Sequence, residues 1–596
     1  MCNENLTLNK TFDLALKNHQ NNNLQDAQNY YQEVLELDPN HLQTLINLGI
    51  IFLRLGERQK AKSCYEKVIE IDHNYADAHN NLGNILKELG EIEKAKDCYE
   101  KAISINPNYV NAHYNLGNIF KELGERQKAK SCYEKVIELN PNFVNAHNNL
   151  GNVLNELGEI EKAKDCYEKT ISINPNYVNA HYNLGNIFKE LGERQKAKSC
   201  YEKAIKIDHN YVDAYNNLGI ILKELGEYQK AKECYEKAIE IDPDLFSASS
   251  NVANIYVSQL TDFETAISKS NETLKIYHKN YKFINQSIPL FKLKHDIEQA
   301  NYLNSKNYKI NGIDEFIKIG VEILRREENA EDKNNYSKKI LLNNDEINSL
   351  LPYLKKNHTY QTKTISRSCI NPNKNWLDVE DEYLNSANQI MYIDDFLSDE
   401  ALIELREFSL VSKVWYKEYN NKYLGAFSDS GFISPIHLQI AVDLQQKLPK
   451  LFGPHKLGKF WGFKYDSTLG KGINVHADFA IHNLNFWITP DEYNNNKNSG
   501  GLKVYDAPAP DNWTFKNYNI NGNKIHKFLK ENNANCTNVP YKFNRAVLFN
   551  SAYFHETDEI DFKNEYEGRR INNTYLFGRR LVKPSEKSMT DPFTMG

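Results

Sequence analysis

Residues 112–135 read AHYNLGNIFKELGERQKAKSCYEK, and the same string recurs unchanged at residues 180–203. Related versions fill the stretches around these two copies, with a period of 34 residues. Such a period is typical of a solenoid made of stacked supersecondary units. Within each copy, small and apolar residues recur at helical spacing while Glu, Lys and Arg take the other positions. We therefore predict an all-α repeat array whose units begin near residues 8, 42, 76, 110, 144, 178, 212 and 246.

Each unit carries the same set of key positions. In the third unit these are Leu82, Gly83, Leu86, Ala95, Tyr99 and Pro107. The glycine lets two helices approach closely, and the proline ends the second helix. This combination resembles the tetratricopeptide repeat. The resemblance implies helix pairs stacked over residues 8–280 into a superhelix, whose concave side binds a protein or peptide.

One asparagine position recurs directly before the Leu-Gly pair of successive units, at Asn81, Asn115, Asn149, Asn183 and Asn217. An amide offers donors and an acceptor that match the backbone of an extended peptide. The arrangement resembles the asparagine ladder in the repeats of O-linked N-acetylglucosamine transferases, which grips peptide backbones. We interpret the five residues as a peptide groove. In the alternative interpretation, the ladder bonds the next helix and stabilises the stack.

Composition limits the classes of function. A net charge of −6 over 596 residues gives no bulk attraction to nucleic acid or to an anionic membrane. There is no apolar run of the roughly 18–20 residues that a membrane span needs, and the N-terminus has no secretory pattern. We expect a cytoplasmic protein that binds neither nucleic acid nor membrane. Six of the nine cysteines recur every 34 residues, as packed thiols rather than disulfides. Nothing in the sequence indicates the oligomeric state.

The style of the sequence changes after residue 280. Residues 281–385 favour an irregular helical connector, and residues 586–596 a tail. Between them, over 386–585, runs such as KFWGFKYDS, INVHADFAI, NLNFWIT, GGLKVYD and RAVLFNS have the composition and boundaries of strands. Several strands of this length favour a sandwich or jelly roll over a parallel sheet. The predicted fold class is therefore multidomain, a helical solenoid followed by irregular helices and a C-terminal jelly roll.

Three residues of the C-terminal region suggest a metal site. His476 and Asp478 are two positions apart on a predicted strand, so their side chains share one face. His555 follows the apolar run AVLFNSAYF and is expected at a strand end. Two imidazoles and one carboxylate form the facial triad of non-haem iron(II) oxygenases. We predict that the three residues are the metal ligands and the catalytic centre.

The three remaining coordination positions of such an ion would suit 2-oxoglutarate and dioxygen. The second carboxylate of this co-substrate needs a cationic partner, and Arg570 offers a planar fork for bidentate pairing. Arg570 is preferred to Arg569 because it shares the more polar face of the predicted strand. Tyr465 could add a hydroxyl to the same site, although a core tyrosine fits its neighbours equally well. Asn485 is assigned to the pocket, with a purely structural role as the alternative.

Residues 393–580 resemble the double-stranded β-helix of the 2-oxoglutarate- and iron-dependent oxygenases, specifically the prolyl hydroxylase-like members fused to tetratricopeptide repeats. The matching pieces are HAD at 476–478, the Gly500-Gly501-Leu502 turn, VLFNSAYFHE and Gly568-Arg569-Arg570. The resemblance implies Fe(II) on the triad, 2-oxoglutarate on the arginine, and hydroxylation of a C–H bond coupled to succinate formation. The sequence departs in having Asn572 where many relatives place Ser, and in a slightly long gap between His555 and the arginine.

These observations predict a dioxygenase that hydroxylates a substrate, with a protein or peptide recruited by the repeats as the favoured one. The main alternative is a non-enzymatic scaffold, with repeats for protein–protein interaction and an inactive barrel. Another is a cupin-type metal enzyme that does not use 2-oxoglutarate. A glycosyltransferase is excluded because no nucleotide-binding βαβ pattern follows residue 380.

Overall fold

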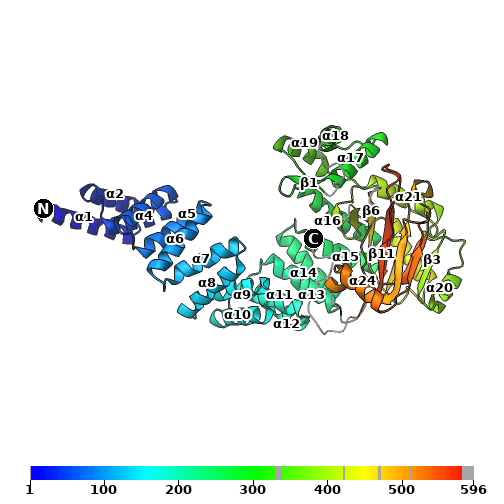
Figure 1. The fold of residues 1–596 in the computed structure, drawn as a ribbon, viewed down its shortest axis with the longest axis horizontal. Coiled ribbons are helices and arrows are strands. Elements are labelled where there is room, and N and C mark those ends of the chain that lie inside the picture. Colours follow the sequence, from blue (N-terminus) through cyan, green and yellow to red (C-terminus); the bar gives the residue numbers. More distant parts are fainter. Residues whose placement is uncertain are drawn as a thin grey trace. The chain divides into compact units, whose positions relative to one another are not determined.

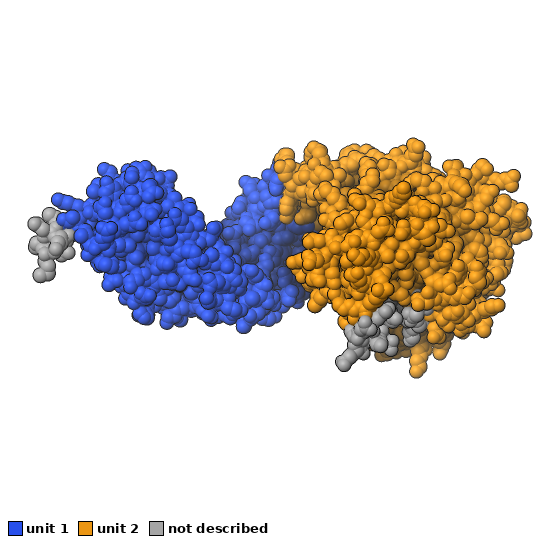
Figure 2. All heavy atoms as spheres, turned by 90° about the horizontal axis from the view of Figure 1, so that it is seen from above, with its two compact units in different colours: residues 1–187, 203–208 blue, residues 188–202, 209–596 orange. Residues whose placement is uncertain are grey.

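The computed structural model describes residues 2–328, 338–419, 423–466, 472–510, 513 and 515–579, and the expected tail at 586–596 lies outside them. The chain divides into two compact units. Unit 1 comprises residues 1–187 and 203–208, and unit 2 comprises residues 188–202 and 209–596 (Figure 2). The expected boundary at residue 280 therefore falls inside unit 2.

The first part of the chain folds into successive helix pairs (Figure 1). The helices are α1 (Cys2–Gln20), α2 (Leu24–Leu37), α3 (Leu42–Arg54), α4 (Arg58–Ile71), α5 (Ala76–Glu88), α6 (Ile92–Ile105), α7 (Val110–Glu122), α8 (Arg126–Leu139), α9 (Val144–Glu156), α10 (Ile160–Ile173), α11 (Val178–Glu190), α12 (Arg194–Ile207), α13 (Val212–Glu224), α14 (Tyr228–Ile241), α15 (Phe246–Gln259) and α16 (Phe263–Lys279). From α3 onward, each pair begins at the residue that the period predicts. The first begins at Cys2 rather than near residue 8. The helical solenoid is confirmed.

A glycine and a tyrosine set the distance between the two helices of a repeat. A Cβ added to Gly83 of α5 would lie 2.7 Å from Cε1 of Tyr99 in α6, so only glycine leaves room for that ring. The turn between the same helices contains Gly90, whose φ of +79° is the left-handed conformation that glycine adopts at no steric cost. Equivalent glycines recur along the array, so one local solution is repeated. The repeated cysteines are free thiols, as expected.

The last repeat packs on the C-terminal region within unit 2. Helix α15 contacts strand β6 (Leu457–Tyr465), and Ser270 of α16 donates to the carbonyl of Ser428 while accepting from the amide of Gly431. His278 of α16 contacts the carbonyls of Leu354 and Lys413 through its two ring nitrogens. The last repeat is therefore part of the same packed body as the strands.

The connector contains irregular helices and one small two-stranded antiparallel sheet. Its elements are β1 (Ser287–Pro289), α17 (Leu290–Ser305), α18 (Ile313–Glu328), β2 (Lys339–Leu341), α19 (Asn344–Leu354) and α20 (Trp376–Asn385). Helix α17 packs against α18 and against α21 (Asp399–Val411) of the C-terminal region. Much of the connector thus contributes to one large core with the region that follows it.

The C-terminal region consists of antiparallel sheets with helices. Its remaining elements are β3 (Ile390–Ile393), β4 (Lys417–Tyr419), β5 (Tyr423–Phe427), α22 (Pro435–Lys447), β7 (His482–Trp487), η1 (Asp491–Tyr493), β8 (Leu502–Pro508), α23 (Phe515–Asn519), α24 (Gly522–Glu531), β9 (Cys536–Val539), β10 (Ala546–Asn550), β11 (Tyr553–Thr557) and β12 (Ile571–Phe577). A seven-stranded sheet has the order β3-β10-β7-β12-β6-β5-β4, and a three-stranded sheet has the order β11-β8-β9.

A shared apolar core joins these two sheets. Trp487 and Val547 of the larger sheet belong to the same buried cluster as Val504 and Val539 of the smaller one. Side chains alternate between the faces of a strand, so the residues of this cluster come from the inner faces. The sheets therefore pack face to face, and the candidate site lies between them.

The structure corrects two details of the predicted strands. Residues 473–481, INVHADFAI, do not form a strand, and His476 makes only an isolated bridge with His555. The reason is that successive amides bond different segments, with Ala477 donating to the carbonyl of Tyr518 and Asp478 to that of Ser551. His555 lies in the middle of β11 rather than at a strand end.

Helices α21 and α22 were not predicted, although each begins with a recognisable N-cap. Ser398 accepts from the amide of Ala401 at the start of α21, and Ser434 caps α22 directly before Pro435. Among the helices of the described residues, none is long and apolar enough to cross a bilayer.

Candidate metal centre

The structure brings His476, Asp478 and His555 together. One potential ligand atom from each lies within 4.8 Å of the others. His555 Nε2 is 3.5 Å from Asp478 Oδ2, and the two imidazole rings have centroids 4.3 Å apart. The bridge between the backbones of His476 and His555 holds the two rings side by side. One metal ion could contact all three side chains.

Each imidazole is oriented by its other nitrogen. His476 Nδ1 lies 2.8 Å from the carbonyl of Asn474, and His555 Nδ1 lies 3.1 Å from that of Tyr553. A carbonyl only accepts, so Nδ1 carries the proton in both rings and Nε2 keeps a lone pair. Metal-ligating histidines are commonly held by this kind of contact. The two rings are therefore in the tautomer that binds a metal through Nε2.

Burial opposes charge at this cluster. Asp478 and His555 are 8 % and 4 % exposed, whereas His476 is partly exposed. Burial raises the pKa of the Asp478 carboxyl, and burial followed by the charge of His476 lowers the pKa of His555 far below its ordinary value. Both shifts reflect the cost of charge without a counter-ion. A divalent cation would supply the missing charge, so the donor set suits one.

Arg570 lies in the same cavity, directly before β12. It is 1 % exposed, and its Nε donates to the carbonyl of Gly500 at 2.6 Å while Nη2 donates to that of Gly501 at 3.3 Å. Its Nη1 has no hydrogen-bond partner among the described residues. Burial lowers the pKa of this guanidinium. A buried cation with an unused donor is costly unless a ligand completes it, and a carboxylate is the matching group.

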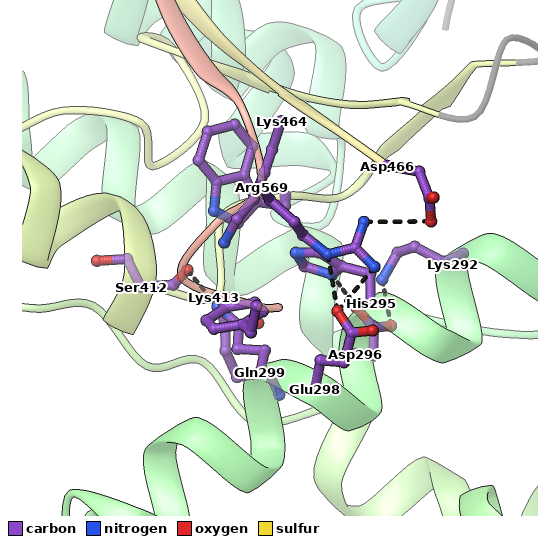
Figure 3. A network of polar contacts seen from close by, with 12 residues as sticks. Lys292, His295, Asp296, Glu298, Gln299, Ser412, Lys413, Lys464, Asp466 and Arg569 are labelled. Atoms are coloured by element: carbon purple, nitrogen blue, oxygen red, sulfur yellow. Dashed lines mark hydrogen bonds and ion pairs between the residues drawn. The ribbon is translucent and has the colours of Figure 1, made fainter. Parts of the chain in front are cut away.

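Arg569, the other arginine considered, points elsewhere (Figure 3). Its Nε and Nη2 each lie 2.7 Å from Glu298 Oε2 of α17, and its Nη1 lies 3.4 Å from Asp466 Oδ2. It belongs to a buried polar network with Lys292, His295 and Asp296 of α17. The charge of Arg569 is thus neutralised by residues that hold the connector against the strands, whereas Arg570 Nη1 has no hydrogen-bond partner among the described residues.

Aromatic rings enclose the rest of the cavity. The Arg570 guanidinium carbon lies 4.8 Å from the ring centroid of Tyr465 and 5.5 Å from that of Trp487. Tyr465 is buried and also stacks on Tyr423 at 5.3 Å, so it combines the pocket position with the core role that the sequence left open. The lining further includes Trp461, Phe463, Ile473, Leu502 and Thr557. These side chains give the space between the three candidate ligands and the arginine a largely aromatic and apolar wall.

Asn485 also lines the cavity, but its amide is used by neighbouring side chains. It donates to Asn483 Oδ1 at 2.5 Å, and its own Oδ1 accepts from Asn572 at 2.9 Å and Thr574 at 2.6 Å. The alternation of Asn483 and Asn485 with apolar neighbours suggested from the sequence that both line the pocket, with a structural role as the alternative, whereas Trp487 was assigned no functional role. The position of Trp487 on β7, two residues from Asn485 on the same face, is the signal that could have pointed to it.

The asparagine ladder of the array bonds within the stack. Asn115 Nδ2 donates to Asn80 Oδ1 at 3.1 Å and to Asn84 Oδ1 at 3.0 Å, both in the preceding repeat. Asn149 and Asn183 make the equivalent bonds one and two repeats later. These contacts are the ones that the alternative interpretation, a ladder that stabilises the stack, requires. The side chains of Asn115, Asn149 and Asn183 remain only partly buried.

Comparisons with known proteins bear on the array. Four family models described as "TPR repeat" or "Tetratricopeptide repeat" match between residues 13 and 245, and the ranges are 83–124, 151–192, 185–226, 110–143, 212–245, 64–97, 132–165, 13–41 and 42–75. The array consists of tetratricopeptide repeats. Such repeats mediate protein–protein interaction, which gives the array a recognition role.

The solved structures similar to the chain include proteins titled as tetratricopeptide repeat proteins. One titled YrrB, "a TPR protein with an unusual peptide-binding site", is 27% identical, with 31% of this chain and 95% of that one covered and a TM-score of 0.29. MamA is 28% identical over 27% of this chain and 94% of that one, with a TM-score of 0.26. PilF of Pseudomonas aeruginosa is 20% identical over 37% and 99%, with a TM-score of 0.33. No curated protein matches the chain.

The tetratricopeptide repeats of unit 1 form a cleft of about 210 Å³. It is lined by Lys121, Asn152, Asn155, Glu156, Tyr167, Asn183 and Asn186. One of the predicted groove residues, Asn183, is thus on its wall, beside Asn152 and Asn186. The cleft is polar and offers amides at its surface, which suits a peptide backbone.

Proposed function

We propose that the C-terminal region is an Fe(II)- and 2-oxoglutarate-dependent oxygenase with a double-stranded β-helix fold. Two antiparallel sheets around one core are the arrangement of that fold. The observation that carries the proposal is the shared cavity, in which the His476, Asp478 and His555 cluster faces a buried arginine with an unused donor. A purely structural metal site has no need of that arginine.

The donor set selects the metal. Two imidazole nitrogens and one carboxylate suit ferrous iron and leave coordination positions open, unlike a closed structural zinc site. When bound, the iron would let dioxygen act as the oxidant of both partners: one oxygen atom would enter a C–H bond of the substrate, and the other would enter the succinate that 2-oxoglutarate forms with loss of carbon dioxide.

The residues of the chain have separate roles in this proposal. Arg570 binds the carboxylate of the co-substrate that lies far from the metal, by charge-assisted hydrogen bonds through its unused Nη1. The ring of Tyr465 packs on that guanidinium and keeps its orientation. Trp487 and Phe463 exclude water from the same space, which protects the reaction from uncoupled chemistry.

The substrate that we propose is a protein or peptide held by the tetratricopeptide repeats. The array is the recognition element of the chain, and its polar cleft in unit 1 fits an extended backbone. The proposed chemistry needs a C–H bond brought to the partly exposed His476 side of the metal cluster. Recruitment by the array raises the local concentration of such a target.

Succinate formation tests the activity. The full-length protein, incubated anaerobically with Fe(II) and then with 2-oxoglutarate and air, should release succinate above the level without iron. Asp478→Ala should lose this release and the metal together, because one ligand is gone. Asp506→Asn is the matched control, since within the described part of the chain this carboxylate bonds Asn535 and lies outside the cluster. Its succinate release should equal that of the wild type.

Two other results would favour a different function for this protein. Absence of metal binding would leave the tetratricopeptide scaffold, which the family matches support on their own. Metal binding without any dependence on 2-oxoglutarate would instead favour a cupin-type metal enzyme.

A further inference from the structure

A chain of amides connects the floor of the cavity to the metal cluster. Asn572 and Thr574 of β12 both contact Asn485 Oδ1, at 2.9 and 2.6 Å. Asn485 Nδ2 donates to Asn483 Oδ1 at 2.5 Å, and Asn483 Nδ2 donates to Asp478 Oδ2 at 2.6 Å. We call Asn483, Asn485, Asn572 and Thr574 the amide relay. It ends on one oxygen of the carboxylate that belongs to the metal cluster.

Strand pairing places the relay. β7 and β12 are antiparallel neighbours in which Thr574 lies opposite Asn485, and Asn572 lies opposite Trp487. Residues two apart on a strand share a face, so Asn483 and Asn485 are aligned along β7. The register therefore brings the relay residues of β12 onto Asn485 without any turn or loop.

The carboxylate fixes the direction of every bond in the relay. An ionised Asp478 only accepts hydrogen bonds, so Asn483 must turn its NH₂ group toward it. The carbonyl of Asn483 then faces Asn485, which must donate in turn. The carbonyl of Asn485 finally accepts from Asn572 and Thr574. Any amide turned the other way would place two acceptors or two donors against each other.

The relay residues are buried, and buried polar side chains are unusual where their only role is to fill the core. Asn483 is fully buried and the other three relay residues are at most 6 % exposed. Burying amides is costly unless they are hydrogen-bonded, and apolar residues of similar size would fill the same space at no such cost. A role beyond filling the core is needed to explain four polar side chains on one inner face.

We propose that the amide relay positions Asp478 for the metal, with Asn483 and Asn485 as positioning residues. The bond from Asn483 stops rotation of the carboxylate, and Asn485 keeps Asn483 turned toward it. The proposal rests on the metal binding in the proposed function but not on the use of 2-oxoglutarate. Partners behind a metal ligand are typically worth about 10–100-fold in metal affinity.

Metal titration of the full-length protein tests the relay. Mn(II) is the probe, added under calorimetry to the wild type, Asn483→Leu, Asn485→Leu and the double variant. Asn483→Leu should raise the Mn(II) dissociation constant about 10–100-fold. Asn485→Leu should raise it several-fold alone but add less than about twofold to Asn483→Leu, because it acts only through that residue.

Asn573→Leu is the matched control. Asn573 is fully buried in the same strand, next to two relay residues, but its side chain lies on the opposite face of β12. Its Mn(II) affinity should equal that of the wild type. The Co(II) absorption spectrum gives a second readout, since a misplaced carboxylate changes the coordination geometry, and the relay variants should differ from the control there.

The outcomes separate the two proposals. If the wild type binds no Mn(II), the proposed function fails and the relay with it. If the wild type binds but Asn483→Leu binds equally well, or if the two leucine substitutions add their full effects, the relay is overturned alone. If Asn483→Leu does not fold, Thr574→Val tests the relay instead. Valine has the shape of threonine but lacks the hydroxyl that donates to Asn485, so the Mn(II) affinity should fall about two- to threefold.

Discussion

Asparagine amides occur in rows in both units, but the rows differ in kind. In the tetratricopeptide array the same bond recurs from repeat to repeat, as in Asn115 to Asn84 and Asn149 to Asn118. In the C-terminal region the amide relay occurs once and ends at Asp478. A repeated contact can be lost at one place while its copies remain, whereas a single contact has no substitute. We therefore expect substitutions and acid to affect the C-terminal region more strongly than the array.

Acid should give the largest difference in stability between the C-terminal region and the array. Burial lowers the pKa of His278 to about 4 and the pKa values of His295 and His437 to about 3, so all three are neutral in the fold. The unfolded chain takes up protons below about pH 6.5, so the free energy of unfolding falls as the pH drops from there toward 3. Between pH 6.5 and 5 the three histidines together should cost on the order of 5 kcal/mol.

Tryptophan fluorescence measures this loss selectively. All five tryptophans of the chain lie beyond residue 375, so their emission reports on unit 2, while far-ultraviolet circular dichroism is dominated by the helices. His278, His295 and His437 all belong to unit 2, so the loss of stability that they cause falls there. At pH 5 the urea midpoint by fluorescence should fall well below that by dichroism. Equal shifts would remove the contrast between the units.

The two adjacent arginines give the next largest effect. Arg570→Met removes the proposed anchor, and charge-assisted bonds of about 1.5–3 kcal/mol make its loss worth roughly 10–100-fold in the co-substrate dissociation constant. Mn(II) affinity should be unchanged, because the guanidinium does not contact the cluster. Arg569→Met is the control and should instead lower the melting temperature, since it removes the buried guanidinium that pairs with Glu298 and Asp466. A normal 2-oxoglutarate requirement in Arg570→Met would place the anchor elsewhere.

Two glycines that face aromatic rings compare packing in the two regions. A Cβ on Gly462 of β6 would lie 2.5 Å from Cζ of Phe432, and one on Gly83 would lie 2.7 Å from Cε1 of Tyr99. Overpacking costs about 1–3 kcal/mol. In the helix, alanine regains about 1 kcal/mol of helix propensity, so Gly83→Ala should cost less than Gly462→Ala. Urea unfolding followed by dichroism and by fluorescence gives the two values, and a larger cost at Gly83 would contradict the expectation.

The smallest effect is expected from a single member of the array ladder. Asn115→Ala removes two bonds to the preceding repeat but leaves the equivalent bonds of Asn149 and Asn183. We expect a loss of about 1 kcal/mol of unfolding free energy by dichroism. The triple Ala variant at the three positions should also weaken binding of a substrate peptide. Unchanged peptide binding would mean that the ladder only stabilises the stacking of the repeats.

The sequence predicted the array well because its contacts are local. The repeat period places the glycine and tyrosine of each unit, and a 34-residue register determines where each helix pair begins from Leu42 onward. The residue order of the second half also indicated His476, Asp478, His555 and Arg570, which the structure places in one cavity.

Contacts between distant segments could not be predicted in the same way. The relay depends on the register of β7 against β12, which are separated by more than eighty residues, and no periodicity encodes it. The choice between Arg569 and Arg570 depends on Glu298, a residue of the connector helix α17 that lies 271 positions away. The same holds for residues 473–481, whose amides bond several segments at once.

The docking of α15 and α16 has a practical consequence for anyone who transfers the C-terminal region into a chimaeric protein. Ser270 and His278 are hydrogen-bonded to backbone atoms of the later region, and the Tyr277 ring lies 4.6 Å from that of Tyr416. A region starting at residue 280 would lack these hydrogen-bond partners and would expose the apolar surface that α15 and α16 cover. The transferred segment should therefore start before Phe246, so that the last repeat is included and still covers β6.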